Sequence, residues 1–192
     1  MSKLLLGSGS PRRKEIIETL NFPFKRVSID CEEDHPTHLD GEEIALFLAE
    51  KKSLAYSEEL EADEVLLTAD TVVWKDGVHL AKPHDRAEAI SMLKDLSGSS
   101  HQVITGVGLR TSDNLHVFAE TTQVVFRELS EKEIDFYVDN YQPFDKAGAY
   151  GIQEWIGMIG IQQIKGCYFN VVGLPCQRLV VELRDLGIKF TA

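Results

Sequence analysis

The feature that most constrains this chain is a regular alternation of β-rich runs and helices with recognisable starts. In a capping box, the residue before a helix and a Glu three positions later satisfy backbone N–H groups that would otherwise be unpaired. Three pairs match this pattern: Asp40 with Glu43, Asp85 with Glu88, and Ser130 with Glu133. Apolar and β-branched runs separate the three predicted helices. Strands that alternate with helices along a chain predict an α/β fold.

Signals at both ends and in the middle of the chain refine this prediction. A short buried strand at 4–6 precedes Ser10-Pro11, a helix cap followed by proline at the first helical position. Two longer strands flank a turn at 111–114, the glycine-rich segment 148–173 is expected to form loops and strands, and a last helix spans 176–186. Because a hairpin pairs antiparallel strands, the predicted architecture is a mixed, twisted central sheet flanked by helices.

Composition limits the class of protein. The 192 residues are 43% hydrophobic, enough for a substantial core, and no repeat or long linker divides them. Residues 1–192 are therefore expected to form a single domain. No run approaches the roughly 20 apolar residues of a membrane helix, and the start of the chain is too short and too broken by glycine for a signal peptide. We expect a cytoplasmic protein without a membrane partner.

Charge and cysteine content narrow the choice further. A formal net charge of −11 argues against a nucleic-acid partner, because binding by counterion release requires a broad basic surface. An anionic ligand must then meet cations that cluster locally. The three cysteines, Cys31, Cys167 and Cys176, are odd in number and lack C-x-x-C spacing, so they are expected to be reduced and buried.

The turn after the first strand is a candidate phosphate site. In Gly7-Ser8-Gly9-Ser10-Pro11-Arg12-Arg13, a strand, a Gly/Ser turn and a helix N-terminus together present free backbone N–H groups. The cations in the first helical turn oppose the helix dipole, and a bound anion would reverse that penalty. A solvated basic cluster is nearly as good an interpretation of this segment alone. It does not match the P-loop pattern.

Two acidic positions are candidates for catalysis or metal binding. Asp70 lies within the β-rich run 65–74, and a carboxylate buried in a strand needs a cation, a metal or hydrogen-bond donors. It is a candidate general base or metal ligand, whereas an aspartate at a strand end is the alternative. Glu33 in an acidic run is a candidate second carboxylate for Mg²⁺, and a solvated loop is the alternative there.

Two lysines are the remaining local candidates. Lys52 shares the i, i+4 row of a predicted helix with Ile44 and Leu48, which places it at the edge of the apolar stripe. Its alternative is a lysine whose ammonium extends from that edge into water. Lys82 precedes Pro83, which favours an extended backbone that can direct the ammonium into a cleft. A surface lysine beside a turn is equally consistent with this pair.

Several of these segments, together with others along the chain, resemble the Maf-like septum-formation proteins, a family of nucleoside triphosphate pyrophosphatases. The similarity spans nearly the whole chain. The segments are Ser8-Gly9-Ser10-Pro11-Arg12-Arg13, Glu33, Lys52, Ala69-Asp70-Thr71-Val72-Val73, Lys82-Pro83, Leu96-Ser97-Gly98 with His101, Asp145-Lys146-Ala147-Gly148-Ala149-Tyr150-Gly151-Ile152-Gln153, and Asn170-Val171-Val172-Gly173-Leu174-Pro175. The resemblance implies a mixed α/β fold similar to inosine triphosphatase-like enzymes, with an active-site cleft between two lobes.

The resemblance also implies a role for each candidate. The triphosphate would be bound by Ser8, Ser10, Arg12, Arg13, Lys52 and Lys82, and Mg²⁺ or Mn²⁺ by Glu33 and Asp70. Asp70 would also be the base that activates water for attack at the α-phosphorus, with pyrophosphate leaving. A homodimer is the prediction for the oligomeric state.

Three positions imply the substrate. Arg12, Thr71 and Gln153 together resemble the subgroup that acts on dTTP and UTP, and a Gln amide offers the donor and the acceptor that a pyrimidine imide edge requires. A methylated-GTP pyrophosphatase, an enzyme for modified pyrimidine nucleotides, and a non-catalytic nucleotide-binding regulator of septum formation are the alternatives. Two departures from the family, Glu154-Trp155 in place of glycine and Cys167 in place of serine, bear on the base pocket.

Overall fold

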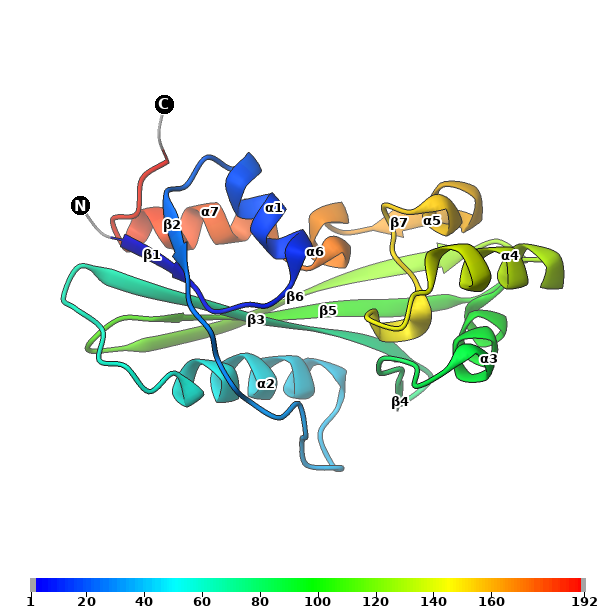
Figure 1. Ribbon diagram of the computed structural model, residues 1–192, viewed down its shortest axis with the longest axis horizontal. Helices are drawn as coiled ribbons and strands as arrows, with labels where there is room; N and C mark the ends of the chain where they lie inside the picture. Colours follow the sequence, from blue (N-terminus) through cyan, green and yellow to red (C-terminus); the bar gives the residue numbers. More distant parts are fainter. Residues whose placement is uncertain (1–2, 191–192) are drawn as a thin grey trace.

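A computed structural model of the protein describes residues 3–190. Its strands form one mixed β-sheet, and helices cover both faces of that sheet (Figure 1). The strands are β1 (Lys3–Leu6), β2 (Phe24–Arg26), β3 (Glu64–Lys75), β4 (Val78–His79), β5 (Ser100–Arg110), β6 (Leu115–Phe126) and β7 (Ile161–Lys165). Their order is β2-β1-β3-β5-β6-β7, and β4 pairs with β3. β1 is parallel to β2 and β3, and the other pairs are antiparallel. The predicted mixed sheet is confirmed.

The helices cover the sheet from both sides. They are α1 (Pro11–Thr19), α2 (Gly41–Ala55), α3 (Arg86–Leu96), α4 (Glu131–Tyr141), α5 (Trp155–Gly160), α6 (Tyr168–Val172) and α7 (Cys176–Asp185), with a 3₁₀ turn, η1 (Ala147–Ala149). Figure 1 shows α1 and α7 together on one face and α2 on the other, with α3 and α4 near one end of the long strands. None of the helices within residues 3–190 combines the length and the apolar character needed to cross a bilayer.

The helix starts follow the local signals closely. Ser10 caps α1, with Pro11 as its first residue. Full capping boxes begin α2 at Asp40 and α4 at Ser130. At α3 the Asp85 carboxylate accepts the N–H of Glu88 (2.9 Å), but the Glu88 carboxylate accepts the N–H of His84, so this box is only half formed. These starts are predictable because each cap depends on residues a few positions apart.

The segment 148–173 departs from the prediction of loops and strands. It forms α5, β7 and α6, and part of η1. The helices α5 and α6 have six and five residues, and neither has a side-chain cap. Such short helices show no repeat of apolar positions, and their stability comes from packing.

Among the described residues, the two largest of four hydrophobic clusters form two cores along the same sheet. Buried residues of β1, β3, α1 and α7 form the first, and buried residues of α3, α4, η1 and α5 form the second. β3 contributes Leu67 to the first core and Val73 to the second, and β5 contributes Val107 and Val103 in the same way. The predicted two lobes are these cores, and the long strands connect them.

Two glycines let α2 approach the sheet closely. A Cβ atom added at Gly106 of β5 would lie 2.0 Å from the carbonyl oxygen of Ala45, and one at Gly108 would lie 3.2 Å from that of Ala49. Thr68 of β3 donates a hydrogen bond to the Ala49 carbonyl at 2.8 Å. Asp70 pairs across the strands with Gly106, so its side chain emerges on the face that α2 covers. This packing brings α2 close to Asp70.

The second core contains a buried histidine. His101 is 2% exposed, its Nε2 lies 2.8 Å from the Tyr150 hydroxyl, and its Nδ1 has no partner among the described residues. Burial, together with the nearby charge of Lys75, lowers the pKa of His101 to about 4. The imidazole ring is therefore neutral in the folded protein at pH 7. Its partner Tyr150 also lines a large surface cavity.

We expect His101 to make folding stability fall with acidity. The unfolded chain binds a proton at this residue below its ordinary pKa of 6.5, whereas the folded protein does not until about 4. Between these values the wild type should lose about 3 kcal/mol more than a His101→Gln variant, whose amide can still bond Tyr150. Urea unfolding of both proteins from pH 7 to 4 measures the difference. Equal pH slopes for the two proteins would contradict the assignment.

Candidate active site

The candidate site lies where one edge of β3 is free. β1 pairs with β3 as far as Leu67, and β4 pairs with it only at Trp74 and Lys75. Among residues 3–190, no strand therefore pairs with residues 68–73 on this side. Asp70 and Thr71 lie in this unpaired stretch of β3, and both line a cavity of about 790 Å³.

All ten residues implied by the sequence line this one cavity. They are Ser8, Ser10, Arg12, Arg13, Glu33, Lys52, Asp70, Thr71, Lys82 and Gln153. They come from the turn before α1, α1 itself, the segment before α2, α2 itself, β3, the segment after β4 and the turn before α5. Residues from both lobes thus meet at the unpaired stretch of β3.

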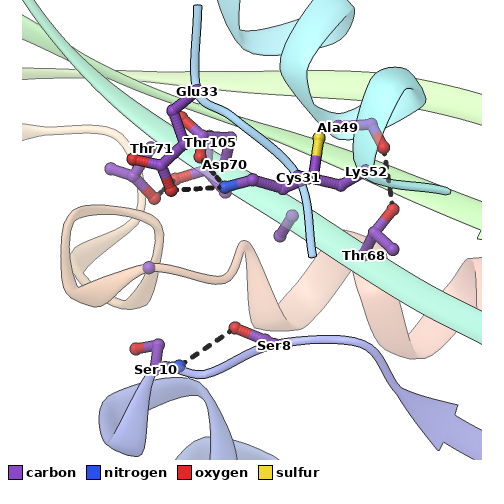
Figure 2. Close-up of polar contacts among 12 residues, drawn as sticks. Ser8, Ser10, Cys31, Glu33, Ala49, Lys52, Thr68, Asp70, Thr71 and Thr105 are labelled. Carbon is purple, nitrogen blue, oxygen red and sulfur yellow. Dashed lines mark hydrogen bonds and ion pairs between the residues drawn. The ribbon is translucent and has the colours of Figure 1, made fainter. Parts of the chain in front are cut away.

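A chain of ion pairs forms the centre of the site. Figure 2 shows the Lys52 ammonium between the carboxylates of Glu33 and Asp70. Lys52 Nζ donates to Glu33 Oε1 at 2.8 Å and to Asp70 Oδ1, and Lys82 Nζ donates to Glu33 Oε2 at 2.6 Å. The Lys52 and Asp70 side chains are only 14% and 12% exposed. Lys52 therefore points into the cavity instead of extending into water.

The ionisation of Glu33 follows from this arrangement. Burial by itself would raise its pKa, but hydrogen bonds and charge from Lys52 and Lys82 outweigh burial and lower the pKa to about 2. Glu33 is thus a carboxylate at neutral pH. Asp70 Oδ2, unlike Oδ1, makes no hydrogen bond with any residue of the described chain. This oxygen remains available to accept a proton.

The Gly/Ser turn is organised by its own serines. The N–H of Ser10 donates to Ser8 Oγ at 3.2 Å, and the N–H of Arg13 donates to Ser10 Oγ at 3.4 Å. Arg26 of β2 donates to the Ser8 carbonyl at 3.2 Å. Arg12 extends across the cavity to Asp145, with a separation of 2.9 Å. The turn is thereby connected to the opposite lobe.

Arg13 occupies a structural position within the wall. Its guanidinium donates to the carbonyls of Gly173 and Ala69, both at 2.9 Å, and to the hydroxyls of Thr71 at 3.0 Å and Ser8 at 3.3 Å. Burial lowers its pKa. Four protein acceptors already use most of its N–H groups. Arg13 ties the turn to β3 and to the segment before α7.

Thr71 and Gln153 lie on different walls. Thr71 points to the face of β3 opposite Asp70, where its hydroxyl bonds Arg13 and lies 3.0 Å from Thr105 Oγ1. Gln153 is exposed in the turn that leads into α5. The two departures from the family lie outside the cavity lining: Trp155 packs on Phe136 with ring centroids 4.8 Å apart, and the backbone of Cys167 bonds Thr122. Neither Trp155 nor Cys167 adds bulk to the cavity.

The cavity is basic although the chain is acidic. Six Lys or Arg and three Asp or Glu line it, whereas the whole chain has a net charge of −11. The cations are Arg12, Arg13, Arg26, Lys52, Lys82 and Lys146. The local clustering that an anionic ligand requires is present.

Several lining residues with charged or imidazole side chains were given no role at the level of sequence: Arg26, His79, His84, Asp145 and Lys146. The last two belong to a segment that the family resemblance quoted, and this was the one signal for them. No local pattern marks Arg26 or His79. The cysteines were predicted to be buried, but only Cys176 is; Cys31 and Cys167 are partly exposed, and all three are free thiols.

The donor chemistry fits a hard divalent cation held jointly with a substrate. Glu33 and Asp70 bring two carboxylates to the same lysine, and the described chain adds no third His, Cys, Asp or Glu to form a protein cage. Mg²⁺ is commonly held by one or two carboxylates together with phosphate oxygens and waters. Glu33 and Asp70 are the residues that would hold it.

Comparisons with known proteins place the chain in a family. The family model described as "Maf-like protein" matches residues 3–186. A "dTTP/UTP pyrophosphatase" of Bacteroides fragilis is 51% identical over 185 residues, and one of Phocaeicola vulgatus is 50% identical over 185 residues; each match covers 96% of both chains. Among solved structures, the Staphylococcus aureus Ham1 protein matches with a TM-score of 0.46 and 16% identity, covering 94% of this chain and 100% of that one. The family follows from the sequence matches alone. This chain belongs to the Maf-like protein family.

Proposed function

We propose that this chain is a nucleoside triphosphate pyrophosphatase that hydrolyses dTTP and UTP to the nucleoside monophosphate and pyrophosphate. Relatives that share about half of its residues over nearly its full length are named for that activity. The observation that carries the proposal is the ion-paired group of Glu33, Lys52 and Asp70 at the free edge of β3, inside a cavity with an excess of cations.

In the proposed reaction, Asp70 is the general base. Its Oδ1 is held by Lys52, so Oδ2 is free to take a proton from a water molecule that attacks the α-phosphorus. The bond from the α-phosphorus to the bridging oxygen breaks, and pyrophosphate leaves with that oxygen. The ammonium of Lys52 holds the Asp70 carboxylate in place before the transfer.

The remaining cations stabilise charge that develops on the phosphoryl oxygens. Lys82 and Arg12 lie on the cavity wall with donors not used by the protein, and the turn around Ser8 and Ser10 begins a helix, where backbone N–H groups favour anions. Arg13 fixes this turn against β3. A divalent cation held by Glu33 and Asp70 would supply further positive charge against the triphosphate when bound.

The proposal assigns recognition of the base to Gln153. Its amide lies exposed on the lobe opposite the Gly/Ser turn at residues 7–10, here called the phosphate turn, and it offers both a donor and an acceptor to the imide edge of uracil or thymine. Arg12 follows the phosphate turn, and its side chain extends toward the same lobe. It therefore lies between the region that would bind the phosphates and the region that would bind the base.

A Gln153→Glu variant should lose its preference for UTP. A carboxylate accepts hydrogen bonds but cannot donate one, so the acceptor of the imide edge would face a negative charge. We expect kcat/KM for UTP to fall about 100-fold, because unpaired polar groups at a recognition site are costly. The ratio of kcat/KM for UTP and methylated GTP checks this, with Gln163→Glu on the exposed part of β7 as the control. An unchanged ratio would remove Gln153 from the base pocket.

The test of the function itself is pyrophosphate release from a panel of nucleoside triphosphates with Mg²⁺, with Mn²⁺ or with chelator, and with identification of the nucleotide product. Formation of UMP and dTMP that depends on a divalent cation is the expected result. Turnover of methylated GTP or of modified pyrimidines would change the substrate and keep the reaction. Nucleotide binding without any turnover would support a regulatory protein instead.

The proposal also concerns the kind of substrate, the location of the protein in the cell and its oligomeric state. The substrate is a free nucleotide, and we infer a cytoplasmic enzyme from the composition of the chain. The homodimer remains a prediction, which light scattering of the purified protein tests.

A further inference from the structure

The turn that carries Gln153 is held at both ends by one buried hydroxyl. Tyr137 lies on α4 and is 0% exposed. Its hydroxyl accepts the N–H of Gly151 at 3.0 Å and donates to Glu154 Oε2. The N–H of Glu154 in turn donates to the Gly151 carbonyl at 3.0 Å. Residues 151–154 thus form a closed turn around Tyr137, with Gln153 near its tip.

The same carboxylate continues the connection toward the phosphate turn. Glu154 Oε1 lies 3.1 Å from the Nζ of Lys146, which is 8% exposed. Lys146 Nζ lies 2.7 Å from Asp145 Oδ1, and Asp145 Oδ2 lies 2.9 Å from Arg12 Nη1. Hydroxyl, carboxylate, ammonium, carboxylate and guanidinium follow one another without a gap.

Positive and negative side chains alternate along this connection, so Lys146 and Asp145 each contact an oppositely charged group on both sides. Burial would raise the pKa of Asp145, but hydrogen bonds from Lys146 and Arg12 outweigh it and lower the pKa, so the link stays ionised. A buried ammonium or carboxylate that loses its partner is strongly unfavourable. Lys146 and Glu154, whose side chains are 10% and 20% exposed, are therefore confined by their pairing. Asp145, which is more exposed, extends the connection from Lys146 to Arg12.

We propose that Tyr137 and Glu154 are positioning residues for base selectivity, which hold the Gln153 turn at a set distance from Arg12 through Lys146 and Asp145. This inference rests on the proposed function for its substrate. A Gln amide distinguishes uracil from cytosine only if the turn fixes both its distance from the base edge and its orientation, because a flipped amide would match cytosine. A displacement of about 1 Å from a productive geometry costs a large part of the gain. The proposed roles of Asp70, Lys52 and Lys82 do not depend on the contacts of Tyr137 with Gly151 and Glu154.

The main test is Tyr137→Phe, which removes one oxygen atom and keeps the ring in the core. It leaves the Gly151 N–H and Glu154 Oε2 without their shared partner, so the turn loosens. We expect the ratio of kcat/KM for UTP over CTP to fall about tenfold, mainly through a higher KM for UTP, with kcat at saturation changed less than threefold. Tyr141→Phe is the matched control, because this tyrosine lies one turn further along α4, is 39% exposed, and its hydroxyl bonds none of the described residues.

A structural loss would lower the rates for both substrates equally, whereas positioning acts through Gln153. On a Gln153→Ala background, Tyr137→Phe should therefore cause no further change in the UTP-to-CTP ratio. An unchanged ratio in Tyr137→Phe itself, or a full further loss on the Gln153→Ala background, would overturn the inference. If Tyr137→Phe does not fold, Glu154→Gln is the second variant; it retains an acceptor for Tyr137 but weakens the Lys146 pair, and the same ratio decides.

Binding of UMP and CMP without metal, measured by calorimetry, separates this inference from the proposed function. A wild type that hydrolyses no nucleotide overturns the function. If that protein still prefers UMP, and Tyr137→Phe removes the preference, the positioning role is supported. If the wild type hydrolyses UTP but Tyr137→Phe has wild-type preferences in both assays, the function is supported and the positioning role is overturned.

Discussion

An Asp70→Asn variant should lose about 10³-fold in kcat on dTTP and UTP, because a general base contributes roughly 10² to 10⁴ to rate and an amide cannot take the proton. The change keeps the shape of the side chain and leaves Lys52 paired with Glu33 at 2.8 Å. Affinity for UMP measured without metal should therefore change only a few-fold. Pyrophosphate release under saturating substrate and calorimetry with UMP give the two numbers.

The control for this variant is Asp113→Asn, an exposed aspartate in the turn between β5 and β6. It should keep wild-type kcat and UMP affinity. If Asp70→Asn retained more than a tenth of the wild-type rate, Asp70 would not be the base, and the free Oδ2 atom would need another explanation. Loss of UMP binding together with the rate would instead assign Asp70 to substrate affinity.

A Gly106→Ala variant should lose about 3 kcal/mol of folding stability. The added Cβ would lie 2.0 Å from the Ala45 carbonyl oxygen and 2.4 Å from its carbon, which are backbone atoms of α2 and cannot rotate away. The helix must move off the sheet, and overpacking of this kind typically costs 1–3 kcal/mol or more. For a domain of this length the expected decrease in Tm is about 10 °C.

The same movement should reduce activity, because α2 carries Lys52 to Asp70. Gly9→Ala is the control for stability, since no atom lies within 4 Å of its added Cβ. Thermal unfolding followed by circular dichroism compares the two variants with the wild type. A Tm for Gly106→Ala within 2 °C of the wild type would show that α2 does not lie against β5 as closely as described.

Local features of the fold were predictable because their causes are local. The caps at Ser10, Asp40 and Ser130 each involve residues two or three positions apart, and each begins a helix where the sequence predicts one. The turn that joins β5 to β6 likewise follows from a few residues. The short helices α5 and α6 were missed, since they have no side-chain cap and are too short for a periodic pattern.

The sequence indicated which residues lie in the candidate site, but it did not indicate which of them contact one another. The sequence by itself, through its motifs and the family they resemble, named ten of the residues that line the cavity. The alternation of strands and helices, with a hairpin among them, predicted the mixed sheet. Only the tertiary structure decided that Lys52 joins Glu33 to Asp70, that Arg13 is occupied by protein acceptors, and that Tyr137 clamps the Gln153 turn. These contacts join residues distant in the chain and depend on how closely α2 and α4 pack, which no short stretch of sequence specifies.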